Sequence, residues 1–540
     1  MSVDKEKQSD IKVHTCPIEA TQPAANAQQD VAGVFISSIV ARDDADELLA
    51  PPSLKETKAL LRKADLIIVT LLQFALSWSL HCIQNADHTV MGSVDKVAIG
   101  SAAVLGMRKD AKLVGQEYAW TSAIIYFGAI VAIIPSLVLM QRLPTNLYIS
   151  TMVLAWGVIT CCLVPSRNFA DLMGVRLLLG LFESVIFAGF GLIISMWYTR
   201  DEQPFRTAIV FSTLSSVMNG LLATACVQYK GTALAQWQLL FLLVGLITSA
   251  WSLLMFWLLP ANPTTAWWLT MRQRVIATRR MTESRTGMEN KTFKVHQAVE
   301  ALVDPKTWFY FLINIALNIP NGGMITFNSI IVQSLGFSLT KTTLLGIPTG
   351  IISWISSLVF GYCAVKTGQR CYSAVASCLI PFIGTILLYK IPRTNTGGSL
   401  ASLYLVYFYW GPYIIMMGAV YANTAGHTKK MIVYAIGEQR SRTQLTTAYI
   451  GYCVGNIVGP QTFKAKQAPQ YTGGIIAMLS CYGCAIVLIF IYRMYLVHLN
   501  RDKEGQKPEP QDLGPQDASA EIDQWQDLTD LKNPRFIYKL

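Results

Sequence analysis

Charge is scarce in this sequence, and acidic charge is scarcest in its middle. Only 14% of the 540 residues are charged and 52% are hydrophobic, whereas an ordinary soluble domain has about 25% charged residues. Residues 65–494 contain 30 basic but only 14 acidic residues. A water-soluble globule of that size needs far more polar surface. The composition therefore excludes a soluble fold and predicts a protein that crosses a membrane many times.

Other features are also missing, and each absence removes a class of function. The 11 cysteines lie mostly within apolar runs, and the pair Cys481-x-x-Cys484 has no second pair to complete a zinc site. The basic residues stand in short loops without interleaved aromatic residues, which excludes a nucleic-acid surface. No basic and apolar leader opens the chain. We expect no metal, no other cofactor, no nucleic-acid partner and no enzymatic activity.

Long apolar runs are what the sequence has in abundance. A bilayer crossing needs about 20 apolar residues, and twelve such runs stand six on each side of a polar gap. We predict an all-α membrane protein of two six-helix halves, with Lys96 in its first outer loop. Its parts are a disordered tail (1–64), the first half (65–259), a central loop (260–306), the second half (307–495) and a second disordered tail (496–540).

The central loop fixes the expected orientation. It carries eight basic and four acidic residues, and positively charged loops stay in the cytoplasm. With twelve spans, both tails are then cytoplasmic as well. Two six-helix halves with the substrate between them are the layout of secondary transporters. We expect a monomer in the plasma membrane.

Two ionisable residues stand within the fourth span, where each costs about 2.5–3.5 kcal/mol to insert. Arg176, Gly180 and Glu183 are spaced i, i+4 and i+7, so they share one helix face. The functional interpretation is a guanidinium that binds an anionic group and a carboxylate that carries a proton. The alternative is that each residue only ties its helix to a neighbour. Asp95 is the next candidate for the proton carrier.

The seventh span contains a proline and paired glycines. Pro320 lacks a backbone donor and Gly322-Gly323 loosens the following turn, which predicts a broken helix. Broken helices in transporters expose backbone groups to substrate. Asn318 and Asn321 stand one turn apart and are predicted to contact the substrate. The alternative is a plain kink with capping asparagines.

Similar patterns predict hinges elsewhere. Pro348 opens the eighth span, and Gly459-Pro460 interrupts the eleventh, with Asn456 beside it as a further candidate substrate ligand. In the aromatic run of the tenth span, Tyr407 is the residue we expect to stack on substrate, although packing is the commoner role of such residues.

One candidate pair lies in a loop. Glu202 and Arg206 stand at i and i+4 after the fourth span and are predicted to close a cytoplasmic gate as an ion pair. A solvated pair of little energetic value is the alternative.

The motifs together resemble the fungal allantoate permease group of the major facilitator superfamily, within its anion:cation symporters. The resemblance covers residues from about Asp95 to Pro469 and the end of the second tail. The matching pieces are Asp95-Lys96, Gln116-Glu-Tyr118-Ala-Trp120, Arg176-x₃-Gly180-x₂-Glu183, Trp197-Tyr198, Asp304-Pro305-Lys306-Thr-Trp308, Asn321-Gly-Gly323, Asn423-Thr-Ala-Gly-His-Thr-Lys-Lys430, Gly459-Pro-Gln461 and Asp527-Leu-Thr-Asp530.

The resemblance implies the major facilitator fold and the proton-coupled uptake of a small organic anion, such as a ureido acid, a vitamin with a carboxylate or a short peptide. The expected partners are that anion, protons and the lipid bilayer. Two alternatives remain open, namely an exporter of a secondary metabolite on the same fold and a non-transporting nutrient sensor.

Overall fold

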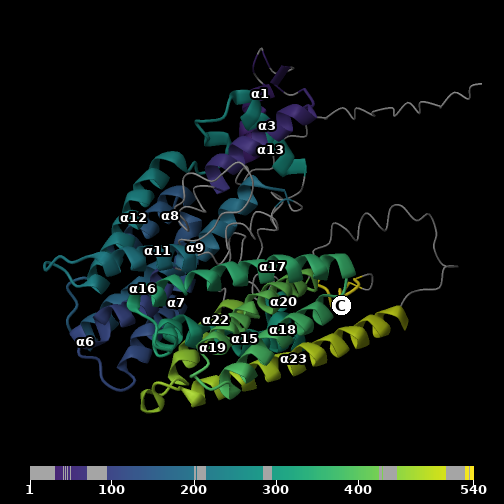
Figure 1. Cartoon of the computed structure of the whole chain (residues 1–540). Coiled ribbons are helices and arrows are strands. Elements are labelled where there is room, and N and C mark those ends of the chain that lie inside the picture. The colour runs from purple at the N-terminus through teal and green to yellow at the C-terminus, as the bar shows by residue number, and fades with distance from the viewer. Residues whose placement is uncertain are drawn as a thin grey trace, which may run out of the picture. The chain divides into compact units, whose positions relative to one another are not determined.

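The computed structural model describes residues 31–40, 42, 44, 47–48, 50–69, 94–199, 202, 215–283, 295–424, 429, 447–505, 529–533 and 536–540. Residues 1–50 and 51–540 form two separate compact units. The first unit contains helix α1 (Val31–Val40) and an ion pair between Arg42 and Asp44. All the other described helices belong to the second unit (Figure 1).

The first half of the second unit begins with a well-capped helix. Helix α3 (Leu54–Ala64) starts at a capping box, in which the Ser53 hydroxyl accepts from the Glu56 N–H at 3.2 Å and the Glu56 carboxylate accepts from the Ser53 N–H at 2.9 Å. It continues into the π-helical turn η1 (Asp65–Val69). The helices that follow are α5 (Val94–Ala102), η3 (Ala103–Met107), α6 (Arg108–Asp110), α7 (Glu117–Arg142), α8 (Thr145–Cys161), α9 (Phe169–Trp197), α11 (Ser215–Gln228) and α12 (Gln236–Leu258).

The second half follows a short helical connection. The connection contains η4 (Pro263–Thr265), α13 (Met271–Glu283) and α14 (Val295–Val303). The next helix begins where the sequence favours it, since Asp304 caps its N-terminus and Pro305 is its first residue. The helices of this half are α15 (Pro305–Gln333), α16 (Leu339–Leu344), α17 (Ile347–Thr367), α18 (Arg370–Lys390), α19 (Thr396–Val406), η5 (Tyr407–Tyr409), α20 (Trp410–Ala422), α22 (Thr447–Gln461), η6 (Ala465–Gln467) and α23 (Thr472–Gly505).

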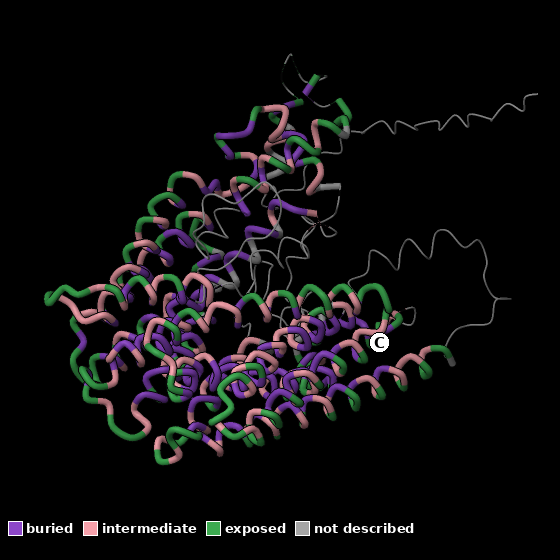
Figure 2. The backbone as a smooth tube through the Cα atoms, viewed as in Figure 1, coloured by how far each residue is buried: buried purple, intermediate pink, exposed green. Residues whose placement is uncertain are grey.

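Several of these helices can cross a membrane. Within the described residues, six helical segments are long and apolar enough to do so: Gln236–Leu258, Pro305–Gln333, Leu339–Thr367, Arg370–Lys390, Thr396–Val420 and Thr472–Glu504. Large apolar side chains such as Trp257, Val359 and Phe490 are exposed on them. Figure 2 shows the same pattern along the helices of the second half, with buried residues facing neighbouring helices and exposed ones facing away. Such an apolar surface suits contact with lipid.

The two halves meet along a few helices. Helix α5 packs against α11 and α12 of its own half and against α15 of the other half, while α22 packs against both α15 and α7. In Figure 1, α15, α18 and α23 of the second half run side by side, and α23 packs against both α15 and α18. Helix α11 also packs against α16 and α17. The described interface between the halves is therefore formed by α5, α7 and α11 of the first half and α15, α16, α17 and α22 of the second.

The predicted break in the seventh span is wrong. Helix α15 runs continuously from Pro305 to Gln333 with Pro320 inside it. The paired glycines have a packing role, because Gly322 lies against the backbone of Asn456 and Gly323 lies against the ring of Phe463. Small residues of this kind let two membrane helices approach closely.

The other predicted hinges lie at helix ends, unlike Pro320. Pro460 is next to the last residue of α22, so the Gly459-Pro460 pair precedes the end of that helix and does not interrupt it. Pro348 stands in the first turn of α17, just after the interruption that separates α16 from α17. A proline fits there because the N–H groups of a first helical turn have no partner within the helix.

The two tails contain more structure than predicted. Residues 54–64 form the capped helix α3, and α23 continues to Gly505. In the last residues of the second tail, Asp530 and Tyr538 are buried. The predicted disorder is therefore wrong for these stretches, because their side chains find partners on the second unit. Most of the predicted first span, at 66–86, lies outside the described residues.

Candidate functional site

Four ionisable side chains are buried where α5 meets α9. Asp95 and Lys96 belong to α5, Arg176 and Glu183 belong to α9, and none is more than 5% exposed. Lys96 Nζ lies 2.5 Å from Glu183 Oε1. Arg176 interacts electrostatically with both Asp95 and Glu183. We call these four residues the charged cluster, and its two cations and two anions balance.

Aromatic residues from both halves surround the charged cluster. Trp156 Nε1 donates to Asp95 Oδ2 at 3.3 Å. The Lys96 ammonium lies 5.7 Å from the ring centre of Tyr126 on α7 and 5.8 Å from that of Tyr452 on α22, distances at which a cation is attracted to a ring. The two tyrosine rings meet edge to face at 5.8 Å. The second half therefore contributes Tyr452 directly to the surroundings of Lys96.

The arrangement explains the spacing of Arg176, Gly180 and Glu183. A Cβ atom at Gly180 would lie 1.9 Å from the carbonyl oxygen of Ile125, so only glycine lets α7 pack this closely against α9. Seven residues along a helix separate Arg176 from Glu183 by about 10 Å, and Glu183 pairs with Lys96 instead. Arg176 Nε has no hydrogen-bond partner among the described residues. A buried guanidinium N–H of this kind can donate to an incoming carboxylate.

A second polar group, which we call the asparagine network, lies between α15 and α22. Asn318 donates to Asn314 Oδ1 at 2.5 Å, and Asn321 donates to Asn456 Oδ1 at 2.9 Å. The Tyr409 hydroxyl donates to Asn321 Oδ1 at 2.5 Å. All five side chains are buried. The structure thus brings together the three predicted ligands Asn318, Asn321 and Asn456.

Tyr409, and not the predicted Tyr407, contacts the asparagine network. The ring of Tyr407 lies 6.2 Å from that of Tyr409, and its backbone oxygen accepts from Ser353 at 2.9 Å. The three-residue turn η5 points the two tyrosines to different neighbours, which the sequence pattern of an uninterrupted helix does not reveal. Asn456 Nδ2 also donates to Tyr452 O at 2.8 Å. Helix α22 therefore connects the asparagine network to the charged cluster.

Hydrogen bonds join the two halves near the start of α7. The Tyr118 hydroxyl donates to the Thr326 carbonyl oxygen at 2.7 Å, and the hydroxyls of Ser122 and Thr326 lie 2.7 Å apart. One turn earlier, Gln116 Oε1 accepts from the Ala465 N–H at 3.2 Å. These contacts hold the two halves together near the start of α7.

The predicted gate pair is only partly within the described residues. Glu202 Oε1 accepts from the Arg280 guanidinium at 2.6 Å, so Glu202 holds α13 of the connection. Arg206 lies outside the described residues.

Within the described residues, no group of three or more His, Cys, Asp or Glu could hold a metal ion. The polar groups of the charged cluster and the asparagine network are the candidates for binding a solute. Comparison with known proteins indicates what kind of protein holds them. Residues 89–460 match the family model for the Major Facilitator Superfamily.

The chain belongs to the Major Facilitator Superfamily.

Relatives agree with this assignment over nearly the whole chain. An MFS-type transporter of Penicillium expansum, cnsL, is 34% identical over 522 residues, which cover 96% of this chain and 95% of that protein. The allantoate permease of Saccharomyces cerevisiae is 29% identical and covers all of both chains. The xylose transporter XylE of E. coli, in a partially occluded inward-open conformation, matches with a TM-score of 0.55 at 12% identity, over 81% of this chain and 98% of that one.

These findings confirm the predicted family and fold. The protein has the major facilitator fold and resembles the fungal allantoate permease group. It is a secondary transporter and a multi-pass membrane protein.

Lys96 is a residue of the charged cluster that the sequence did not reveal. Composition placed it in an outer loop, whereas α5 buries it against Glu183. The signal that could have found it is the Asp95-Lys96 motif shared with the family. Asn314 and Tyr409 were missed as well, although Asn314 stands at i−4 from Asn318 and therefore on the same helix face.

Proposed function

We propose that this transporter takes up a small carboxylate-bearing metabolite together with a proton. The observation that carries the proposal is the buried Lys96–Glu183 pair at 2.5 Å, beside Arg176 and Asp95. Buried charges are costly unless they are paired. An unbalanced buried charge is costly, so the transporter can enclose its site only when the bound proton and substrate leave the site neutral.

The charge count gives the coupling rule. The empty charged cluster is neutral, with two cations and two anions. A proton on Glu183 raises the net charge to +1 and removes the ion pair between Glu183 and Lys96. A substrate carboxylate then restores neutrality. The neutral states are the empty cluster and the cluster that holds both proton and carboxylate, which is the pattern of a symporter.

In this proposal Arg176 binds the carboxylate of the substrate, and the asparagine network binds its other polar groups. The Arg176 guanidinium offers a planar pair of donors that fits a carboxylate. The asparagine side chains offer both donors and acceptors, which suit the amide or ureido groups of a polar metabolite. The likeness to an allantoate permease supports a substrate of this kind. Inward passage across a plasma membrane, with both tails in the cytoplasm, completes the proposal.

Uptake by whole cells tests the proposed function. Cells that contain the transporter are given a panel of radiolabelled carboxylates at an outside pH below the inside pH. We expect at least one of them to accumulate against its gradient, because the pH difference drives the cycle. One proton that enters with one carboxylate moves no net charge, so the membrane potential adds nothing. A protonophore should abolish the accumulation.

Three results would contradict the proposal. Accumulation that a protonophore leaves unchanged would exclude proton coupling. Efflux of preloaded substrate without uptake would identify an exporter. Saturable substrate binding with no flux in either direction would identify a sensor.

A further inference from the structure

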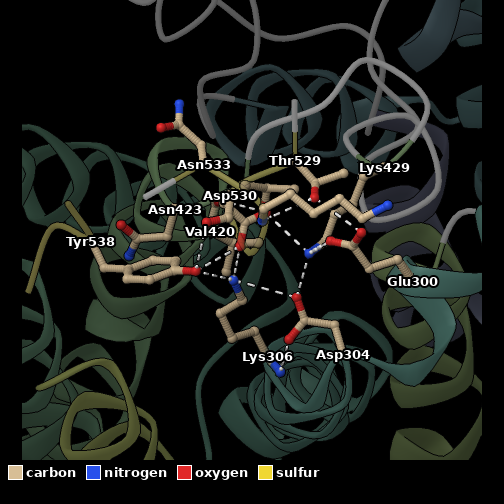
Figure 3. Close-up of polar contacts among 12 residues, drawn as sticks. Glu300, Asp304, Lys306, Val420, Asn423, Lys429, Thr529, Asp530, Asn533 and Tyr538 are labelled. Carbon is tan, nitrogen blue, oxygen red and sulfur yellow. Dashed lines mark hydrogen bonds and ion pairs between the residues drawn. The ribbon is translucent and has the colours of Figure 1, made fainter. Parts of the chain in front are cut away.

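The chain's second tail returns to the ends of the second-half helices and binds there. Residues 529–533 and 536–540, which we call the docked segment, contact α14, α15, α18, α20 and α23 or the residues beside them. In Figure 3, Asp530 points into a group formed by Lys306, Lys429, Asp304 and Glu300, with the ring of Tyr538 beside Lys306. The transport cycle described above makes no use of these contacts.

Asp530 is the centre of the contact. It is fully buried, it pairs with the ammonium of Lys306, and its Oδ1 lies 3.0 Å from Lys429 Nζ. Lys429 also pairs with Asp304 at 2.7 Å and with Glu300 at 2.9 Å. Burial lowers the pKa of the Lys429 ammonium, but Asp530, Asp304 and Glu300 together raise it by more, so the pKa lies above its usual value and Lys429 stays charged. Without Asp530, two buried lysines would lose a shared anion.

Tyr538 is the second anchor. Its hydroxyl donates to Asp530 Oδ2 at 3.0 Å, and Lys306 Nζ lies 4.3 Å from the centre of its ring. Burial and the Asp530 carboxylate raise its pKa, so the hydroxyl keeps its proton. The Tyr538 N–H and carbonyl oxygen bond the amide of Asn500 on α23 at 2.9 and 3.0 Å.

Main-chain bonds complete the docking. The Lys539 N–H donates to Asn423 Oδ1 at 2.6 Å, and the Asn423 amide donates to the Lys539 carbonyl oxygen at 2.8 Å. The Arg370 N–H donates to the Leu540 carbonyl oxygen at 2.6 Å. Thr529 Oγ1 donates to Glu300 Oε2 at 3.0 Å, which also ties α14 to the segment.

We infer that the ends of α15, α18, α20 and α23 form a peptide-binding site whose ligand is the docked segment of the same chain, residues 529–533 and 536–540. The site recognises the Asp530 carboxylate, which lies between Lys306 and Lys429, and the ring of Tyr538 eight residues further along the chain. When the segment is bound, its hydrogen bonds and ion pairs connect these helix ends and α14 to one another. Because Thr529 lies against Glu300, an added negative charge at position 529 releases the segment by repulsion.

Hydrogen exchange on the full-length transporter tests the inference. The amides of Arg370, Tyr538 and Lys539 should be protected, because each donates a hydrogen bond made only when the segment is docked. We expect Asp530→Asn and Thr529→Asp each to speed their exchange at least tenfold. Lys532→Ala should leave it unchanged, since that side chain is exposed. Equal exchange in Asp530→Asn and the unaltered protein would overturn the inference.

A second measurement separates docking from a general loss of fold. The full-length Asp530→Asn transporter, whose own segment is released, is purified in detergent and titrated with a fluorescent peptide of residues 527–540. We expect saturable binding that Asp530→Asn in the peptide weakens at least tenfold and Lys532→Ala does not. Binding that is not saturable, or that is equal for the two peptides, would overturn the inference. Neither measurement depends on the identity of the transported solute.

Discussion

At the residue scale, Arg176 is the residue whose substitution shows whether the charged cluster binds an anion or only holds the helices together. It is 2% exposed, and its Nε has no hydrogen-bond partner among the described residues. Lysine would keep the positive charge but lose the planar fork that fits a carboxylate.

We therefore expect Arg176→Lys to lower the rate of substrate uptake about tenfold or more, a loss of about 1.4 kcal/mol or more. Uptake of radiolabelled substrate and surface labelling of the protein give the measurement. Arg142→Lys, an exposed arginine in the last turn of α7, is the matched control and should behave as the unaltered protein. Near-normal uptake by Arg176→Lys would reduce Arg176 to a structural charge.

Lys96 gives a second test at this scale. Replacing it by Met would leave the charged cluster with one cation and two anions, so an added proton would restore neutrality and an added carboxylate would upset it. We expect Lys96→Met to abolish anion uptake, and Lys96→Arg to retain part of it because the cation is kept. The measurement is the uptake of radiolabelled substrate by each variant, normalised to the amount of protein that surface labelling detects. Normal uptake by Lys96→Met would contradict the charge count.

The sequence located individual site residues better than it located their partners. Arg176 and Glu183 could be predicted because a charge within an apolar run is costly wherever the helix lies. Lys96 could not, because it stands outside the apolar runs that predict the spans, and only the path of α5 buries it. The partner of Glu202 was missed for a similar reason, since Arg280 is distant in sequence.

At the scale of helices, the packing of α15 against α22 supports the asparagine network. A Cβ atom at Gly459 would lie 2.3 Å from the Ile319 carbonyl oxygen and 2.8 Å from the Gly323 nitrogen, so the two backbones are in contact. Any side chain at this position must push the helices apart.

We expect Gly459→Ala to destabilise the transporter by about 1–3 kcal/mol, the usual cost of overpacking. Thermal unfolding in detergent measures this as a lower melting temperature. Gly361→Ala on α17 is the matched control, because a Cβ atom there meets nothing within 4 Å. If the two variants melted at the same temperature, the close approach of α15 and α22 would be wrong.

The helix scale is also where a sequence rule failed. Proline and glycine inside an apolar run predicted a break at Pro320, yet α15 is continuous. In a membrane bundle the same small residues also serve close helix packing. The sequence shows that the residues are small but not which neighbour they face, so it could not choose between the two roles.

At the scale of the whole molecule, the fold was the most predictable feature. Apolar length and charge placement depend on the bilayer and need no knowledge of packing. The predicted halves remain a prediction where residues such as 70–93 lie outside the described ranges. The docked segment was not foreseen, because its composition is that of a polar tail and its order comes from distant partners such as Lys306.

The orientation of the whole chain can be tested in the central loop. Asn290-Lys-Thr292 is a glycosylation sequon in the sequence and lies outside the described residues. We expect Asn290 to carry no glycan, and Asn290→Cys to react with a membrane-impermeant thiol reagent only after cells are permeabilised. Val114→Cys, at a 73% exposed position in the predicted outer loop, should react in intact cells. A glycan on Asn290 of the native protein would contradict the topology.

The central claim is that one buried carboxylate couples protons to the anion. The direct measurement is the proton-to-substrate ratio in proteoliposomes, from the pH change and the radiolabel taken up in the same sample. We predict about one proton per carboxylate for the unaltered protein, since one proton restores neutrality to the loaded charged cluster. Glu183→Gln, which mimics the protonated acid, should still exchange substrate for substrate but take up no protons and accumulate nothing. Normal accumulation with normal proton uptake by Glu183→Gln would show that the coupling acid lies elsewhere, with Asp95 the next to test.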